Sequence, residues 1–318
     1  MRIADGIRLF GAPRPVGKKS SYLIAPQSLH HRLPEASLPD AATAEVRRST
    51  TAGKPAMRTV DISYAGRTVR LANLPEYEKF YRKLSGGRWE TGTFQTLARN
   101  LDRDTVCVDI GAWIGVTPMW SAQVAKAVIA VEPDPKCVGI LRKIAADAPN
   151  VTVLEGALAV DRSVAINAVE GFGSSETSVL DIGDGECTTV RGISMDEIMS
   201  HADGQEVFVK IDIEGYEFAI ADEIAKLRNY RVRGLQIAVH PQLYEKTLKG
   251  SRLSRRLRVA WATWQFGQLF NGFLPAPRFA KFGSLAGYVI KGVLFRRVPK
   301  GADLVFERHP VRSEPETP

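Results

Sequence analysis

The chain has 318 residues, 44% of them hydrophobic and 25% charged, which is typical of a soluble globular protein that buries one large core. No apolar run reaches the roughly 18 residues that a membrane-spanning helix needs, and polar residues interrupt the N-terminus too early for a secretory signal. The three cysteines are too scattered for a metal cluster and cannot all pair. We therefore expect a protein of the reducing cytoplasm.

The net charge of +8 is unevenly distributed along the chain. Residues 105–244 carry −9, whereas residues 1–104 carry +8 and residues 245–318 carry +9. An acidic centre with basic flanks suggests that the flanks meet an anionic partner or surface. Solvated surface charge explains the same pattern equally well.

The pattern divides the chain into a leader (1–59), a section that packs on the core (60–104), an α/β domain (105–309) and a tail (310–318). The leader contains six prolines and shows no hydrophobic period, so we expect it, like the tail, to be extended or partly disordered. The elements expected in the second section are a hairpin turning at Ala65-Gly66, a helix from Pro75 to about Leu84, and a helix through Leu101 capped by Thr91 or Thr93.

The next stretch, from Val106 to Gly115, is typical of a buried strand that ends in a carboxylate, Asp109, and turns through two glycines into a helix. The spacing from Gly111 to Gly115 differs from the glycine pattern of dinucleotide-binding proteins. An anion beside the turn suits a ligand with a positive amino group better than a pyrophosphate. About 20 residues further on, a second strand ends in Glu132, the position of an acid that holds ribose hydroxyls. Together these features indicate S-adenosylmethionine, a cationic nucleoside.

Strands and helices then alternate as a mainly parallel sheet with helices on both faces requires. The expected elements are strands 105–110, 127–132, 151–155, 206–212 and 234–239, and helices 116–125, 135–147 and 217–228. Because parallel strands present their carboxyl ends at one edge, Asp109, Glu132, Gly156, Asp212 and His240 should meet in one crevice. Residues 287–290 and 303–306 predict a final strand pair that adds one antiparallel strand.

Three motifs make the chain resemble the FkbM family of S-adenosylmethionine-dependent O-methyltransferases: Asp109-Ile-Gly-Ala-Trp-Ile-Gly115, Val131-Glu-Pro-Asp-Pro135 and Lys210-Ile-Asp-Ile-Glu-Gly-Tyr-Glu217. The resemblance runs from about Glu76 to Glu307. It implies a Rossmann-like class I methyltransferase fold and a hydroxyl acceptor on a sugar, a glycolipid or a secondary metabolite. The family usually has a small polar Asn where this chain has Trp113.

The candidate cofactor contacts come from the strand ends and from the resemblance. The glycine turn and second strand supply Asp109, Gly111, Ala112, Trp113, Gly115, Glu132 and Pro133. The resemblance adds Glu90, for which a surface charge at a helix N-terminus is the alternative, and Gly156 and Ala157, where the backbone would recognise adenine. Asp212 would lie beside the methyl group. The loop 171–178 resembles a substrate-facing loop, and a plain hairpin connection explains it almost as well.

Methyl transfer to an alcohol needs alignment of two atoms and a base for the alcohol proton. Histidine titrates near neutrality, so we assign His240 as base, Asp212 as its orienter or a substrate ligand, and Glu214 as a third catalytic candidate. Helix capping by Asp212 and a structural role for His240 are the alternatives. Asp212 and Glu214 would share an ion only if the chain turned between them, and we assign no metal ligand.

The segment 245–282 combines basic and aromatic residues. At helical spacing Leu253, Leu257, Ala260, Trp261 and Trp264 share one face. Such a helix can lie at a membrane surface, cover the active site, form a homodimer contact or pack in the core, and the sequence leaves these interpretations open.

Other classes of protein are less consistent with the motifs. Enzymes that methylate nitrogen in nucleic acids carry a Pro-rich aromatic tetrapeptide where this chain has Asp212-Ile-Glu-Gly, so we expect no nucleic-acid partner. An NAD-dependent oxidoreductase is disfavoured by the glycine spacing. A non-catalytic cofactor-binding or scaffold protein remains an alternative because of Trp113 and Gly156.

Overall fold

The computed structural model describes residues 58–87, 89–168, 171, 173, 177–179, 186–275, 278–279, 287, 298 and 301–308. Nearly all of the expected leader (1–59) and the whole tail (310–318) lie outside these residues. Within the described part, no helix is both long enough and apolar enough to cross a bilayer.

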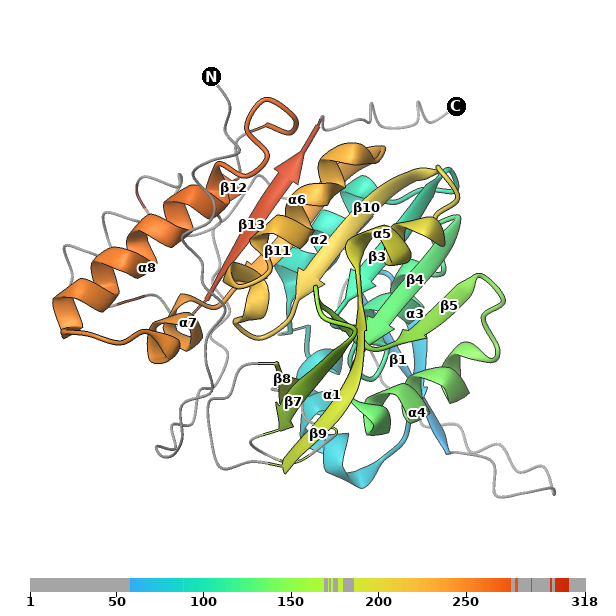
Figure 1. Cartoon of the computed structure of the whole chain (residues 1–318). Helices are drawn as coiled ribbons and strands as arrows, with labels where there is room; N and C mark the ends of the chain where they lie inside the picture. Colours follow the sequence, from blue (N-terminus) through green and yellow to red (C-terminus); the bar gives the residue numbers. More distant parts are fainter. Residues whose placement is uncertain are drawn as a thin grey trace.

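Seven of the described strands form the central sheet shown in Figure 1. They are β3 (Thr105–Ile110), β4 (Ala127–Glu132), β5 (Val151–Glu155), β10 (Glu206–Asp212), β11 (Val232–Val239), β12 (Arg278–Phe279) and β13 (Ala302–Glu307). Counted along the chain, they lie in the order 3-2-1-4-5-7-6, so the order reverses between β3 and β10. All residues of β3 are buried, as expected for a parallel strand covered on both faces.

The mainly parallel sheet with one antiparallel strand is confirmed, because β13 runs antiparallel to both of its neighbours. The predicted partner of β13, residues 287–290, lies mostly outside the described residues. Within them, the strand that pairs with β13 at this edge is β12, at 278–279. Gly287 is helical, and 288–290 lie outside the described residues.

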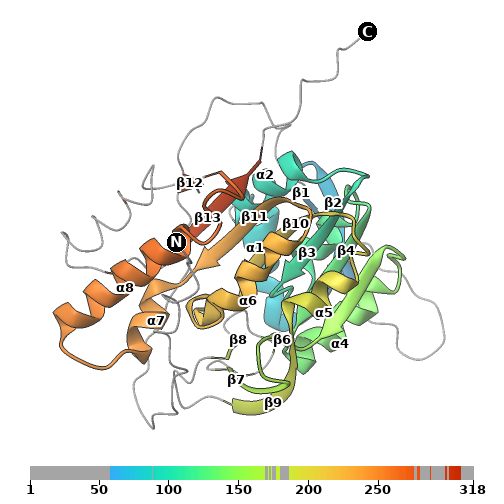
Figure 2. The same ribbon diagram turned by 45° about the horizontal axis from the view of Figure 1, so that its top comes forward.

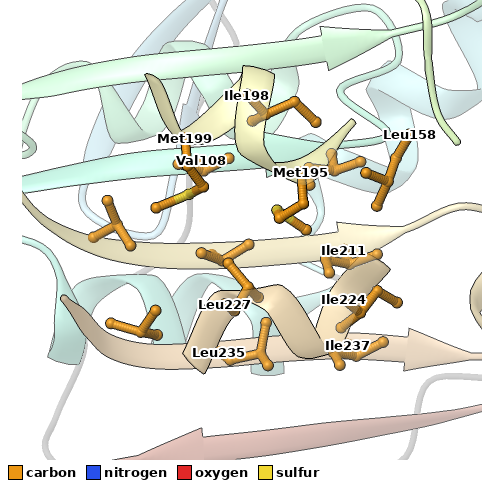
Figure 3. Packing of buried hydrophobic residues seen from close by; sticks show 14 of the residues in the cluster. Val108, Leu158, Met195, Ile198, Met199, Ile211, Ile224, Leu227, Leu235 and Ile237 are labelled. Atoms are coloured by element: carbon orange, nitrogen blue, oxygen red, sulfur yellow. The ribbon is translucent and has the colours of Figure 1, made fainter. Parts of the chain in front are cut away.

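Helices cover both faces of the sheet, as predicted. One face packs against α5 (Met195–Ser200) and α6 (Ala221–Ala225), whose side chains meet those of the sheet in Figure 3. The other face packs against the hairpin of β1 (Thr59–Tyr64) and β2 (Arg67–Ala72) and the helices that follow it. These helices are α1 (Glu78–Ser85), α2 (Thr91–Asn100), α3 (Val116–Ser121) and α4 (Pro135–Ala145).

Several helix limits differ from the sequence expectations. Neither Thr91 nor Thr93 caps α2, because the helix begins at Thr91 itself and Glu90 holds the preceding position with a φ of 43°. The Thr91 hydroxyl instead donates to the Gly87 carbonyl. The expected helix 217–228 is divided into a 3-10 turn (Tyr216–Phe218), α6 and a second 3-10 turn (Lys226–Asn229).

A small second sheet occupies the interval between β5 and β10. It contains β6 (Ala157–Leu158), β7 (Ser163–Ala168), β8 (Thr177–Ser178) and β9 (Glu186–Ile193), in the order β6-β9-β7-β8. In Figure 1 its strands lie beyond the carboxyl ends of β3 and β4. This position brings β8 to the edge of the sheet where the predicted site lies, and Ser178 of β8 contacts Glu214 there.

The basic aromatic segment forms α7 (Pro241–Thr247) and α8 (Arg252–Gly267). The helix α8 packs on the protein through Val259, Ala262, Thr263 and Phe266. The face of Leu253, Leu257, Trp261 and Trp264 is exposed. Core packing of that face was therefore the wrong interpretation.

We predict that Gly111→Ala lowers the free energy of unfolding by about 2–4 kcal/mol. Gly111 has a φ of +87°, and a Cβ there would lie 1.8 Å from the Asp212 carbonyl oxygen. Chemical denaturation would measure the loss. In the control, Gly139→Ala, the new methyl group meets no atom within 4 Å, and a helix interior gains up to about 1 kcal/mol from this change. Equal stability of the two variants would contradict the close approach.

Candidate cofactor and acceptor site

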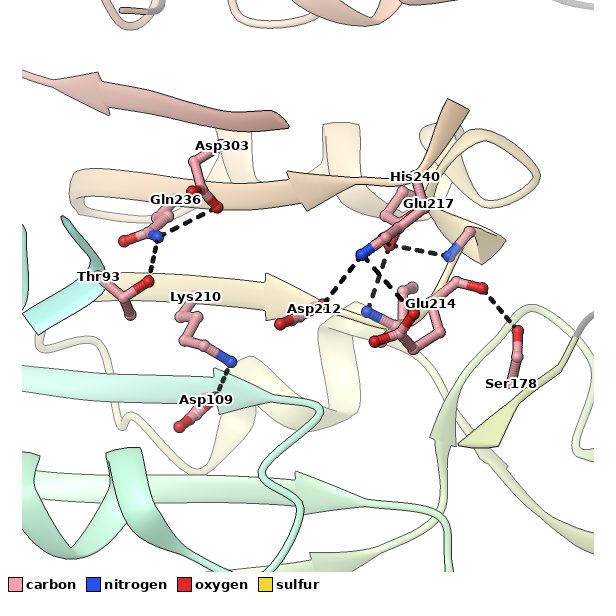
Figure 4. A network of polar contacts seen from close by, with 12 residues as sticks. Thr93, Asp109, Ser178, Lys210, Asp212, Glu214, Glu217, Gln236, His240 and Asp303 are labelled. Carbon is pink, nitrogen blue, oxygen red and sulfur yellow. Dashed lines mark hydrogen bonds and ion pairs between the residues drawn. The ribbon is translucent and has the colours of Figure 1, made fainter. Parts of the chain in front are cut away.

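The predicted site residues meet at the carboxyl ends of the parallel strands, beside the reversal of strand order. Asp109 lies near the end of β3, Glu132 ends β4, Asp212 ends β10 and His240 follows β11. Figure 4 shows the part of this group between β3 and β11. Ligands of open α/β sheets bind at such a position.

The glycine turn lies directly against the neighbouring strands. The backbone N–H groups of Gly111 and Ala112 both donate to the Val131 carbonyl, at 2.9 and 3.1 Å. Gly115 has a φ of +92°, and a Cβ there would collide with Leu141 and Ile144 of α4. These contacts explain why the turn needs its two glycines.

Glu132 accepts hydrogen bonds from one residue of the glycine turn and from one residue that follows β4. One carboxylate oxygen accepts from the Trp113 N–H at 2.7 Å and the other from the Asp134 N–H at 2.9 Å. Burial raises the pKa of Glu132 to about 7. Each oxygen keeps a further lone pair, so the carboxylate can still accept from ribose hydroxyls. Pro133, which follows it, is partly buried.

Trp113 belongs to an aromatic cluster rather than to an open ligand wall. Its ring centroid lies 5.5 Å from Tyr77, 4.7 Å from Phe80 and 6.4 Å from Trp89. Its indole N–H donates to the Gly173 carbonyl at 3.0 Å. The large side chain therefore connects the section before β3 to the loop between β7 and β9, and direct contact with the cofactor stays a prediction.

Gly156 is required by the approach of β9. A Cβ at this position would lie 2.6 Å from the Arg191 carbonyl oxygen. The Gly156 N–H donates to the Glu132 carbonyl at 3.0 Å, and Ala157 behind it is buried. The backbone beside Glu132 is thus held in place, as recognition of adenine by backbone atoms requires.

The loop predicted to face the substrate is attached to other elements through two of its described residues. The Tyr77 hydroxyl donates to the Gly173 carbonyl at 2.6 Å, and the Ser178 hydroxyl donates to the Glu214 carbonyl at 2.8 Å. Residues 172 and 174–176 lie outside the described part. The antiparallel pairing of β7 with β8 supports the hairpin interpretation, and the substrate-facing role of the loop stays a prediction.

A buried ion pair, which the sequence analysis missed, lies beneath the site. Lys210 and Asp109 are direct partners in the register of β10 and β3, with Nζ 3.1 Å from Oδ1. The Thr117 hydroxyl donates to the other oxygen of Asp109. Burial lowers the pKa of Lys210, but the neighbouring carboxylates, first Asp109 and then Asp212 and Glu90, outweigh burial and raise it. A lysine in the apolar run of β10 was the signal for this pair, since lysine is rarely buried unless paired.

Glu90 belongs to the same group of charges. Burial, and next the charge of Asp212, raise its pKa to about 8, whereas Lys210 opposes the rise. Glu90 is therefore close enough to the carboxyl end of β10 to interact with it. This placement favours the predicted role near the cofactor over a surface charge that only stabilises α2.

His240 lies among three carboxylates. Its Nδ1 is 3.2 Å from Glu217 Oε1, and its Nε2 is 3.6 Å from Glu214 Oε2 and 3.9 Å from Asp212 Oδ1. Burial lowers the pKa of His240, but Glu214, Glu217 and Asp212 outweigh burial and raise it well above 6.5. His240 was expected to titrate near neutrality, but the carboxylates around it favour the protonated ring and raise its pKa.

Glu217 organises the loop that brings these carboxylates together. It is fully buried, and its Oε1 accepts from the N–H groups of Ile213 and Gly215. Glu214 and Gly215 both have positive φ values, 52° and 95°, so the chain turns directly after β10. The role of Glu217 is not visible in its motif, since only the folded loop shows its partners.

Asp212, Glu217 and His240 could also hold a divalent cation. Each offers one ligand atom, and these atoms lie within 4.8 Å of one another. Among the described residues, Asp212 Oδ1 and Glu217 Oε2 are buried oxygens without a hydrogen-bond partner. The chain turns at Glu214 and Gly215, but the ligand atoms that it brings together belong to Asp212, Glu217 and His240 and not to Glu214. The absence of a metal therefore stays a prediction.

The strand order and the placement of this site define a class I methyltransferase of Rossmann-like topology. The Methyltransferase FkbM domain family matches residues 109–270, and the chain belongs to this family. No curated protein matches the chain.

Three solved structures illustrate how distant the structural similarities are. The chain is similar to a putative methyltransferase from Streptococcus mutans in complex with SAH (11% identity, 69% of this chain and 97% of that chain, TM-score 0.39). It is also similar to the Methanococcus jannaschii fibrillarin pre-rRNA processing protein (12% identity, 84% and 88%, TM-score 0.36). A third is the 23S rRNA methyltransferase ErmE (16% identity, 69% and 68%, TM-score 0.34). Likenesses this low carry no information on the acceptor.

We predict that the imidazole of His240 is still protonated at pH 7.5, because its pKa is raised well above 6.5. Nitrogen NMR shifts would show an imidazolium, and His240→Gln would assign the signal. Glu214→Gln removes the largest contribution that raises this pKa and should move it down towards the ordinary value of histidine. A neutral ring at pH 7.5 in the unsubstituted protein would contradict this electrostatic description.

Proposed function

We propose that the protein transfers a methyl group from S-adenosylmethionine to a hydroxyl oxygen of a sugar, a glycolipid or a secondary metabolite. The observation that carries the proposal is the convergence, at one sheet edge, of a ribose-type acid (Glu132) with the acidic group of Asp212, Glu214 and Glu217. Family membership supports methyl transfer, and the hydroxyl acceptor rests on the loop sequence after β10.

The crevice suits a cationic cofactor electrostatically. Six carboxylates, Glu90, Asp109, Asp212, Glu214, Glu217 and Asp303, interact with two cationic groups, Lys210 and His240. When bound, S-adenosylmethionine supplies an electrophilic methyl group on a sulfonium, and its positive charge would offset part of this negative excess. Glu132 would hold the ribose, and Asp212, whose Oδ1 makes no hydrogen bond but lies 3.9 Å from His240 Nε2, would lie on the side on which the methyl is transferred.

The chain's own residues can align the acceptor and remove its proton. As the C–O bond forms and the C–S bond breaks, the hydroxyl proton passes to a carboxylate. We assign this role to Asp212, whose Oδ1 has no hydrogen-bond partner. His240, held protonated by Glu214 and Glu217, would orient Asp212 and the acceptor oxygen instead of acting as the base.

We predict that Asp212→Asn and His240→Gln each lower the rate of methyl transfer at least about 100-fold. Affinity for S-adenosylhomocysteine should change less than about threefold, because neither residue binds the ribose. Formation of S-adenosylhomocysteine with a panel of hydroxylated acceptors would measure turnover, and Asp203→Asn, at an exposed turn, is the control. Full turnover in both variants would contradict the catalytic assignment. If the unsubstituted protein bound S-adenosylhomocysteine but methylated no acceptor, the scaffold alternative would be favoured.

We predict that Glu132→Ala weakens binding of S-adenosylhomocysteine at least tenfold, since a buried charged acceptor for two hydroxyls is lost. Calorimetry would measure the dissociation constant. Glu155→Ala is the matched control, because Glu155 is the exposed partner of Glu132 in the register of β4 and β5. Equal affinities in the two variants would contradict the ribose role, provided that both unfold cooperatively.

A further inference from the structure

The helix α8 presents an apolar stripe to solvent. Leu253 is 64% exposed, Leu257 49%, Trp261 61% and Trp264 39%. Among the described residues, these four and Val160 are the exposed large hydrophobic side chains. By helical periodicity the stripe lies roughly opposite the buried face of Val259, Ala262 and Phe266. A contiguous exposed patch of this kind marks an interaction surface.

The charged residues of α8 itself are all positive, and one of them, Arg255, pairs with Glu245 of α7 at 3.8 Å. The helix contains four arginines and no acidic residue. Arg256 and Arg258 lie on the two sides of the stripe by helical periodicity, and Arg252 is exposed in the first turn. Lys246 and Lys249 precede the helix, and the whole segment 245–318 carries +9. The partner that fits must therefore be apolar and anionic at once.

We propose that this stripe docks on an anionic lipid surface. Tryptophan and leucine insert at the boundary between headgroups and acyl chains, while arginines at the sides pair with lipid phosphates. A symmetric contact between two copies would instead bring two arginine rows together. This charge repulsion disfavours the homodimer that the sequence left open.

The position of α8 allows such docking without disturbing the sheet. In Figure 2 the helix lies at the periphery of the molecule, beside α7. It is also firmly attached, because Phe266 contacts Phe218 at 5.4 Å between ring centroids, and Phe218 stacks on Tyr244 of α7 at 4.8 Å. Phe218 follows Glu217, and α7 follows His240 directly. Docking would thus hold the acidic group of the crevice at a fixed distance from the lipid surface.

The test is co-sedimentation of the full chain with vesicles of phosphatidylcholine alone or with one quarter phosphatidylglycerol. We expect binding to the anionic vesicles only, with weaker binding at higher salt. Leu257→Ser/Trp261→Ser should weaken binding at least tenfold, and Arg252→Gln/Arg256→Gln should do the same at low salt. Val160→Ser, which removes an exposed apolar side chain elsewhere, is the matched control.

Since all substituted side chains are exposed or partly exposed, thermal unfolding should confirm that the variants fold. Failure of the folded protein to bind anionic vesicles would overturn the proposal. So would binding that the α8 variants leave unchanged. Analytical ultracentrifugation tests the alternative occupant, a second copy of the chain. A dimer that becomes a monomer in Leu257→Ser/Trp261→Ser would show that this copy covers the stripe and would also overturn the proposal. None of these results depends on methyl transfer.

Discussion

The ion pair between Asp109 and Lys210 connects β3 and β10 at the point where the strand order of the central sheet reverses. Both side chains are almost completely buried. Removing one partner of such a pair typically costs about 3–5 kcal/mol, because the other charge stays buried and uncompensated. One residue pair further along the strands, Ile110 lies opposite Ile211, and beyond it Gly111 packs against the Asp212 carbonyl. The geometry of the crevice therefore depends on this register.

Two cationic side chains offset part of the negative charge of the site. Lys210 interacts with Asp109 and its neighbours, and His240 interacts with the carboxylates that follow β10. One carboxylate oxygen of Glu217 accepts hydrogen bonds from two backbone N–H groups, so this carboxylate also holds the loop after β10 in place. The negative charge that remains suits a cationic donor. The demethylated product lacks the positive charge of the donor, so the negative charge of the site would favour replacement of the product by a new donor molecule.

Much of the fold could be predicted because it is encoded locally. Runs such as Val106–Ile110 are too short and too β-branched for helices, and paired glycines mark where they turn. What could not be predicted depends on distant neighbours. The raised pKa of His240 comes from three carboxylates that meet only when the chain turns at Glu214 and Gly215. Helical spacing places Leu257 and Trp261 on one face but does not say which face of α8 meets the core. The role of Lys210 needs the register of β10 against β3.

The most direct test of the crevice is a crystal structure with S-adenosylhomocysteine. The ribose hydroxyls should lie about 2.6–3.0 Å from the Glu132 carboxylate, and the sulfur should face Asp212 above the turn at Gly111. A nucleoside bound elsewhere on the molecule, or one bound in the crevice without touching Glu132, would contradict this assignment of the site.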